Sequence, residues 1–91
     1  MVTAIVLINA KRGQIQEIAS KLVEMEGISE VYSVGGRFDL VAIIRVPSNE
    51  AMANLVTSQL ARMDSIGHTE TLLAFQSFSK HDLDAMFSIG N

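Results

Sequence analysis

Two hydrophobic periods, of about two and about 3.6 residues, divide this chain into strands and helices. Runs rich in β-branched and apolar residues predict four strands. These runs are Val2–Asn9, Ile28–Val34, Phe38–Val46 and Thr69–Phe78. Pro47 ends the third run, and the adjacent Gly35 and Gly36 can supply the positive φ angles of a tight hairpin between the second and third.

Two segments between these strands have helical spacing. Their apolar stripes consist of Ile15, Ile18, Ala19, Leu22 and Val23, and of Met52, Leu55, Val56, Leu60 and Met63. Gly27 stands where a C′ glycine would end the first helix, and Ser48 or Asn49 can cap the second. Residues 79–82 (Ser-Lys-His-Asp) have the form of a capping box, which predicts a short last helix over 80–91.

The predicted order is β-α-β-β-α-β with a helical tail. A chain of 91 residues forms one domain. The order is that of an α+β, ferredoxin-like domain with an antiparallel sheet. We expect the domain to span 1–79, with 80–91 as its tail helix.

Both faces of the predicted sheet are apolar. On the first and third strands, one face carries Ala4, Val6, Ala42 and Ile44, and the other carries Ile5, Leu7, Val41 and Ile43. Two helices can cover only one face of a sheet, and a small domain with 48% apolar and 19% charged residues has few polar groups to cover the other. We therefore expect a face-to-face homodimer, similar to a dimeric α/β barrel.

Composition narrows the classes of function. The net charge is −3 and the seven basic residues are scattered along the sequence, so direct nucleic-acid binding is not expected. The chain has no cysteine, and its apolar runs are far shorter than a membrane span. The N-terminus lacks the basic region of a signal peptide, which favours a cytoplasmic protein.

The hairpin carries the most informative chemistry of the chain. Arg37, Phe38 and Asp39 place a cation, an aromatic ring and a carboxylate beside each other at the rim of an apolar sheet. These groups suit a small zwitterion, because the cation can meet a carboxylate, the carboxylate an ammonium group and the ring an apolar side chain. The simpler interpretation is that both charges are solvated turn residues and that Asp39 caps the turn backbone.

No catalytic or metal-binding pattern is present. The two histidines, His68 and His81, have no carboxylate or cysteine at metal-ligand spacing. Neither a nucleophilic triad nor a phosphate-binding glycine loop occurs. We expect no metal, no cofactor and no catalytic residue. His68 precedes Thr69, Glu70 and Thr71 in a polar strand entrance that is a weaker candidate for ligand contact.

From residue 2 to residue 79 the chain resembles the effector-binding (RAM) domain of the leucine-responsive regulatory protein (Lrp)/AsnC family. The resemblance lies in Ile28–Val34, in the hairpin Gly35–Leu40 and in Ile66–Thr71 before the last strand. The hairpin of this family usually reads Gly, any residue, Tyr or Phe, and Asp, followed by an apolar strand. Residues 36–40 (Gly-Arg-Phe-Asp-Leu) fit that form, with Phe38 in place of the frequent tyrosine.

The resemblance implies an amino-acid sensor. In this family dimers assemble into rings, commonly octamers, and effector sites lie between dimers, where the hairpin meets the segment equivalent to His68–Thr71 of a neighbour. Asp39 and backbone groups near Gly35 and Gly36 would then hold the polar head of the ligand, with hydroxyls from Thr69 and Thr71. The chain begins at the first strand, without the family's helix-turn-helix, so it resembles the stand-alone RAM proteins.

The sequence leaves three functions open. The first is an oligomeric sensor of an amino acid, acting alone or by modulating a full-length Lrp/AsnC regulator in transcription regulation. The second is a dimeric α+β barrel enzyme acting on a small molecule, which the apolar positions expected to face the helices disfavour. The third is a structural partner that mixes with regulator rings and binds no small molecule.

Overall fold

A computed structural model describes residues 1–80, and the expected tail helix falls outside them from residue 81 onward. The elements run β1 (Val2–Ala10), α1 (Ile15–Val23), β2 (Ile28–Ser33), β3 (Leu40–Val46), α2 (Asn49–Asn54), a π-helical turn η1 (Leu55–Gln59), a 3₁₀ turn η2 (Leu60–Arg62) and β4 (Ile66–Ala74). This order confirms the predicted ferredoxin-like β-α-β-β-α-β arrangement.

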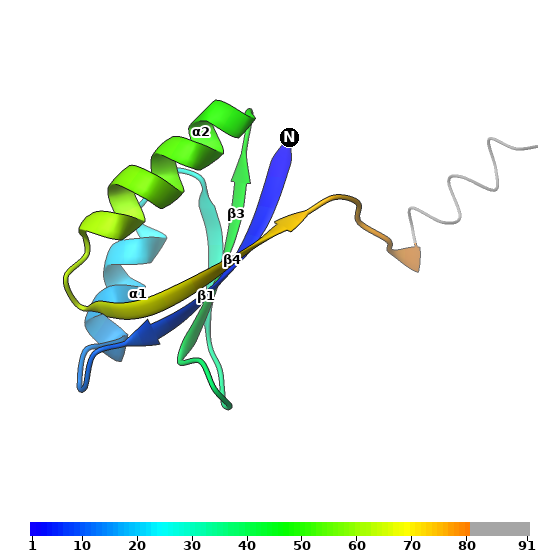
Figure 1. The fold of residues 1–91 in the computed structure, drawn as a ribbon. Coiled ribbons are helices and arrows are strands. Elements are labelled where there is room, and N and C mark those ends of the chain that lie inside the picture. The colour runs from blue at the N-terminus through cyan, green and yellow to red at the C-terminus, as the bar shows by residue number, and fades with distance from the viewer. Residues whose placement is uncertain (81–91) are drawn as a thin grey trace, which may run out of the picture.

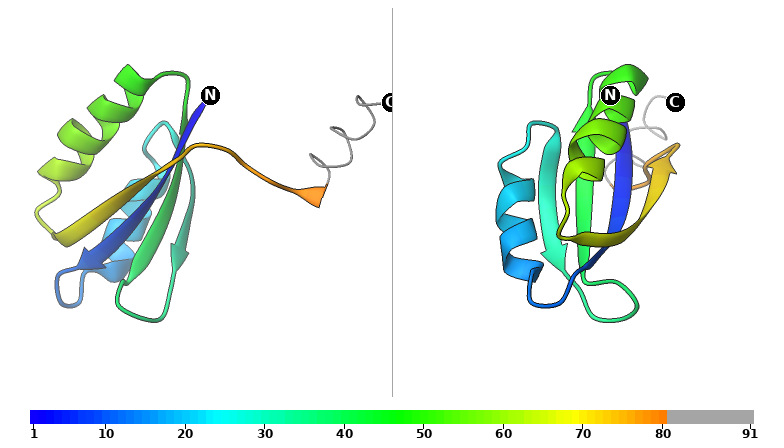
Figure 2. Two further views of the ribbon diagram at one scale, coloured as in Figure 1. Left: turned by 45° about the vertical axis from the view of Figure 1, so that its right-hand side comes forward. Right: turned by 60° about the vertical axis from the view of Figure 1, so that its left-hand side comes forward.

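The four strands form one antiparallel sheet in the order β2-β3-β1-β4. Both helices lie on the same side of this sheet, as two views agree (Figures 1 and 2). The central strand β1 fixes the register, since Ile8 pairs with Leu40 on one side and with Thr69 on the other. The end of the β1–β3 ladder and the end of the β1–β4 ladder therefore both lie close to the hairpin that joins β2 to β3.

The core lies between the sheet and the two helices. Its largest fully buried side chains are Val6, Ile8, Ile18, Leu22, Leu40 and Ile44. Alternate residues of β1 and β3 enter this core because successive side chains of a strand point to opposite faces. Both predicted apolar stripes reach this core, but Ile15 and Val23, at the two ends of the first stripe, are exposed instead.

The other face of the sheet is apolar and faces away from the helices. Ile5 pairs with Ile43 and Leu7 with Val41, and all four of these side chains are only partly buried. Nearby, Leu72 keeps 50% of its surface exposed. The centre of this face on β1 and β3 is therefore apolar, as predicted, and polar side chains on this face lie around it.

Strands β1 and β2 end within one residue of the prediction, whereas β3 and β4 differ more. Strand β3 begins at Leu40 rather than Phe38, and β4 spans Ile66–Ala74 rather than Thr69–Phe78. Strand β4 ends earlier than predicted because its partner β1 runs out: Ala74 already lies opposite Thr3, near the start of β1. Past that point the chain runs away from the sheet and leaves Phe75 93% exposed (Figure 1).

Of the two predicted helix boundaries, one is confirmed and one is wrong. Ser48 caps α2, where its Oγ accepts a hydrogen bond of 3.1 Å from the amide of Ala51. Gly27 is not the C′ residue of α1, which already ends at the cap Glu24. Gly27 instead has a φ of +100° in the turn that leads into β2.

Candidate functional site

Three segments converge at one end of the sheet: the end of β1, the hairpin between β2 and β3, and the start of β4 (Figure 1). Asp39 links the first two. Its amide donates to the carbonyl of Ile8 at 2.9 Å, its carbonyl accepts from Val34 at 3.0 Å, and its Oδ2 accepts from the amide of Ala10 at 2.9 Å. The carboxylate therefore holds a neighbouring strand rather than its own turn.

An aromatic pair links the hairpin to β4. The rings of Phe38 and His68 stack with their centroids 6.5 Å apart and their planes 19° from parallel. Phe38 is half-buried and His68 is exposed, so the pair forms a partly accessible aromatic surface. The two residues lie 30 positions apart in sequence, and this contact within one chain was not predicted.

The hairpin tip is exposed. Only Gly36 has a positive φ, of +122°, so the expectation that both glycines supply one is wrong for Gly35. A side chain at either glycine would meet nothing within 4 Å, which leaves the backbone there open to approach. Arg37 is exposed, and its guanidinium has no ion-pair partner among residues 1–80.

The remaining predicted residues do not all meet at one point. Thr69 and Thr71 pair with Ile8 and Val6 and share the helix-covered face with them, whereas His68 pairs with Asn9 on the open face. His68 and Thr69 contribute to the lining of a cavity of about 300 Å³ beside the second helical segment. Its other lining residues are Val56, Leu60, Ala61, Met63, Ile66 and Gly67. The sequence did not reveal this cavity, because Val56, Leu60 and Met63 were assigned to the core and only the strand entrance at His68 and Thr69 was considered for ligand contact.

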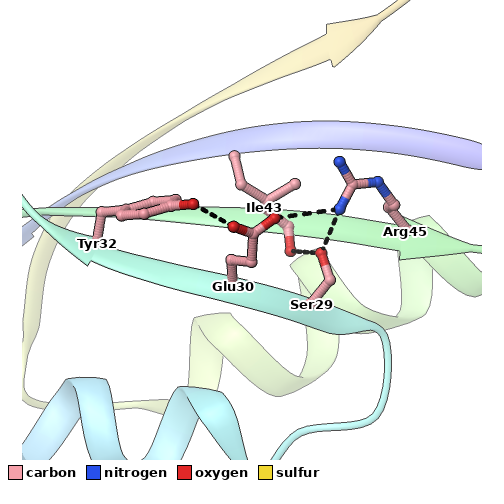
Figure 3. Close-up of polar contacts among 5 residues, drawn as sticks. All are labelled: Ser29, Glu30, Tyr32, Ile43 and Arg45. Carbon is pink, nitrogen blue, oxygen red and sulfur yellow. Dashed lines mark hydrogen bonds and ion pairs between the residues drawn. The ribbon is translucent and has the colours of Figure 1, made fainter.

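A polar network that the sequence analysis missed lies on edge strand β2 and its neighbour β3 (Figure 3). Ser29 is an extra residue in the ladder, because Ile28 pairs with Ile44 and Glu30 with Ile43. Arg45 donates to Ser29 Oγ at 2.7 Å and lies 3.5 Å from a carboxylate oxygen of Glu30.

Glu30 and Tyr32 change the titration of each other in this network. The Tyr32 hydroxyl donates to the Glu30 carboxylate, and this bond is the largest single cause that holds the pKa of Glu30 below its ordinary value, with the guanidinium of Arg45 lowering it further. The same bond raises the pKa of the Tyr32 hydroxyl. Both side chains are exposed.

Within residues 1–80, no group of three or more histidine, aspartate or glutamate side chains is placed to hold a metal ion. No helix in the same part of the chain has the length and hydropathy needed to cross a bilayer.

The family is decided by comparison with known proteins. Residues 3–83 match the profile of the Lrp/AsnC ligand binding domain. This chain belongs to the Lrp/AsnC family. The match covers the sheet from its second residue, Thr3, and both helices, and it includes Phe38 and Asp39.

Members of the Lrp/AsnC family from archaea and bacteria are similar to this chain. It is 32% identical over 75 residues to the HTH-type transcriptional regulator FL11 of Pyrococcus furiosus, covering 82% of this chain and 49% of FL11. It superposes on TTHA0845 of Thermus thermophilus with a TM-score of 0.82 and 36% identity, over 88% of this chain and all of that one. The chain spans about half the length of the curated relatives it matches.

A more distant structure shows the fold alone. The transcriptional regulator NMB0573 of Neisseria meningitidis, in a complex with L-Met, has a TM-score of 0.78 at 10% identity, over 86% of this chain and 52% of that one. The Lrp/AsnC match thus confirms the resemblance found in the hairpin and in the segment before β4.

Proposed function

We propose that this chain is an oligomeric amino-acid-binding module related to Lrp/AsnC transcriptional regulators. The observation that carries the proposal is the match of residues 3–83 to the ligand binding domain of that family. The relatives that are named as transcriptional regulators support a role in regulation rather than in catalysis. A cytoplasmic location and weak, nonspecific binding to DNA are parts of the same proposal.

The end of the sheet offers the groups that such a ligand needs. The Oδ2 of Asp39 accepts a hydrogen bond from the amide of Ala10. The Oδ1 of Asp39 has no hydrogen-bond partner among residues 1–80, so this oxygen is available to an ammonium group. Exposed backbone at Gly35 and Gly36, with the guanidinium of Arg37, suits a carboxylate. The Phe38–His68 pair is an aromatic surface for an apolar side chain.

Assembly is part of this proposal. The open face of the sheet packs against a second copy, and dimers meet through their hairpins in a larger ring, as the family resemblance implies. Phe38 and His68 of one chain then form one wall of the site. Thr69 and Thr71 of the neighbouring chain lie on the surface that this wall meets. A full-length Lrp/AsnC regulator is a further proposed partner of such a ring.

A thermal-shift screen against the twenty standard amino acids tests the binding function. A ligand that binds only the native state raises the melting temperature with its concentration, by an amount that follows from its affinity. L-Met is a reasonable first probe because a protein of the same fold is in a complex with it, although 10% identity shows the fold alone. We expect one or a few amino acids to shift the transition, and to lose that effect when Asp39 is replaced by Asn.

The three functions that the sequence left open give different results with the same protein and the same amino acids. An amino acid that is bound and recovered chemically unchanged supports a sensor, whereas its conversion to a product supports the barrel enzyme. If no amino acid shifts the transition and the chain still joins a full-length regulator in mixed assemblies, the structural-partner function is favoured.

A further inference from the structure

The fold gathers basic residues that are scattered in the sequence. Four of the seven lysine and arginine residues line one open concavity of about 560 Å³. They are Lys11 and Arg12 in the loop after β1, Lys21 on α1, and Arg62 at the end of η2. We call this feature the basic concavity. The scattered positions of these residues along the sequence did not reveal it.

Two loops are tied together to build it. The amide of Lys11 donates to the carbonyl of Ser65 at 2.8 Å, which joins the loop after β1 to the loop before β4. Gly13 then turns the chain with a φ of +76°, and the amide of Gln14 donates back to the carbonyl of Lys11 at 3.0 Å. These backbone bonds bring the loop that carries Lys11 and Arg12 beside the loop that follows Arg62, and all three residues line the same hollow.

Half of the positive charge there is not balanced by carboxylates. Glu17 and Asp64 also line the basic concavity, so its cations outnumber its carboxylates by two, although the whole chain carries −3. Lys21 is paired with Glu17 at 3.1 Å. Within residues 1–80, Lys11, Arg12 and Arg62 have no carboxylate within ion-pair distance, and all three are exposed.

We propose that the basic concavity binds a small phosphate-bearing anion, such as a pyrophosphate group, either free or as part of a nucleotide. Arginine binds phosphate through two parallel hydrogen bonds and lysine adds a compact charge, so this set of cations suits several phosphate oxygens. The volume lies within the range of small-ligand sites. The whole chain carries a net charge of −3, which disfavours a long run of nucleic-acid phosphates across its surface and favours a small ligand held at the concavity alone.

The basic concavity is distinct from the amino-acid site proposed above. None of its lining residues belongs to the hairpin or to the segment 68–71. The first turn of α1 adds to the positive potential, because its cap Gln14 makes no side-chain hydrogen bond to the backbone amides there. The proposal itself rests on the unpaired cations around the hollow.

Titration of the full chain with sodium pyrophosphate at low ionic strength, followed by amide NMR and calorimetry, tests this proposal. We expect saturable binding, with shift changes concentrated in residues 11–17 and 62–65. The double variant Arg12→Gln/Arg62→Gln should weaken binding about tenfold or more, as expected for the loss of charge-assisted hydrogen bonds. Glu17→Gln should instead tighten binding, because it frees Lys21, and a gain of affinity cannot result from unfolding.

Two comparisons complete the experiment. The double variant Arg45→Gln/Lys80→Gln removes the same charge at the other end of β3 and beyond β4, and it should leave pyrophosphate binding unchanged. A parallel titration with ADP distinguishes a free anion from a nucleotide. Tighter binding of ADP than of pyrophosphate indicates that the ligand is a nucleotide. The proposal is overturned if pyrophosphate does not saturate, if the control double variant weakens binding equally, or if Glu17→Gln does not tighten it.

Discussion

The backbone amide of Ala10 donates a hydrogen bond of 2.9 Å to Oδ2 of Asp39, across 29 positions of sequence. The bond lies just beyond the last pair of the β1–β3 ladder, Ile8 with Leu40, where the two strands separate. The carboxylate thus satisfies an amide that no strand partner reaches. It also fixes the base of the hairpin against β1, so a residue proposed to contact ligand has a structural role as well.

Replacing Asp39 separates these two roles. Asp39→Ala should lower the free energy of unfolding by about 1–3 kcal/mol, because the Ala10 amide loses a charged acceptor. The domain should still fold, since this is less than the stability of a typical domain. The same substitution should weaken amino-acid binding by about 2–4 kcal/mol through the loss of a charge partner. Urea unfolding and calorimetry measure the two quantities.

Asp39→Asn is the matched variant. Its amide oxygen can still accept from Ala10, so its stability should stay close to that of the wild type, while the charge that meets an ammonium group is gone. Arg37→Ala should change stability little and weaken binding less than either variant, because Arg37 is exposed. Full binding by Asp39→Asn, with a destabilised Asp39→Ala, would mean that this carboxylate serves only the hairpin.

The order of the elements along the chain and the two faces of the sheet could be predicted because they depend on local periodicity. The alternation of Ala4, Val6 and Ile8 with Ile5 and Leu7 can be read from consecutive residues of the sequence. Strand ends are different, since they depend on where a partner strand runs out. Strand β4 ends at Ala74 because Ala74 lies opposite Thr3, near the start of β1. Residues 75–78 contain no sequence pattern that predicts this end.

The candidate site was predicted in its residues but not in its contacts. The hairpin motif identified Phe38 and Asp39, yet the stack on His68 and the bond to Ala10 depend on the register of strands distant in sequence. The basic concavity was missed for the same reason. Arg62 lies 50 positions from Arg12, and only the pairing of the loops after β1 and before β4 brings them to one hollow.

Gly27 is expected to tolerate a side chain poorly. A Cβ there would lie 2.8 Å from Cγ1 of Val46 and 3.0 Å from Cδ1 of Leu55, at a φ of +100°. Gly27→Ala should therefore lower the free energy of unfolding by about 2–4 kcal/mol, from backbone strain and overpacking together. Gly13→Ala provides the control, because it has a φ of +76° with nothing within 4 Å and should lose only about 1–2 kcal/mol. Equal losses in the two variants, measured by urea unfolding, would show that contacts at Gly27 are unimportant.

The bond between Tyr32 and Glu30 should be visible in the titration of both groups. Tyr32→Phe should raise the pKa of Glu30 toward its ordinary value, and we expect Arg45→Gln to raise it less, because the hydrogen bond from the tyrosine is the largest single cause of the lowering. Carbon-detected NMR of the Glu30 carboxyl measures both changes. A larger rise in Arg45→Gln than in Tyr32→Phe would mean that the guanidinium, not the hydroxyl, controls this carboxylate.

The direction of the pH dependence follows from these shifts. A carboxyl whose pKa is lowered on folding stabilises the native state above its unfolded pKa, and that contribution disappears as the pH falls through the folded value. The phenol, whose pKa is raised, stabilises the native state below its unfolded pKa, and that contribution is lost as the pH rises through the folded value. The stability difference between wild type and Tyr32→Phe should therefore be largest at neutral pH and shrink in acid and in alkali. A difference that grows in acid would contradict this assignment.

The open face of the sheet leads to the last prediction. Ile43 lies opposite Ile5 on this face and is only partly buried in a single chain, so a second copy would complete its burial. Ile43→Asp should dissociate or unfold the protein, because a carboxylate placed in an apolar interface has no partner. Gln16→Asp adds the same charge on the exposed side of α1, where an acidic residue suits the first turn, and should leave the assembly intact. Sedimentation at micromolar concentration measures the outcome. The wild type should sediment as a dimer or a larger species, and a folded wild-type monomer, or an Ile43→Asp protein that sediments like the wild type, would show that this face is not the interface.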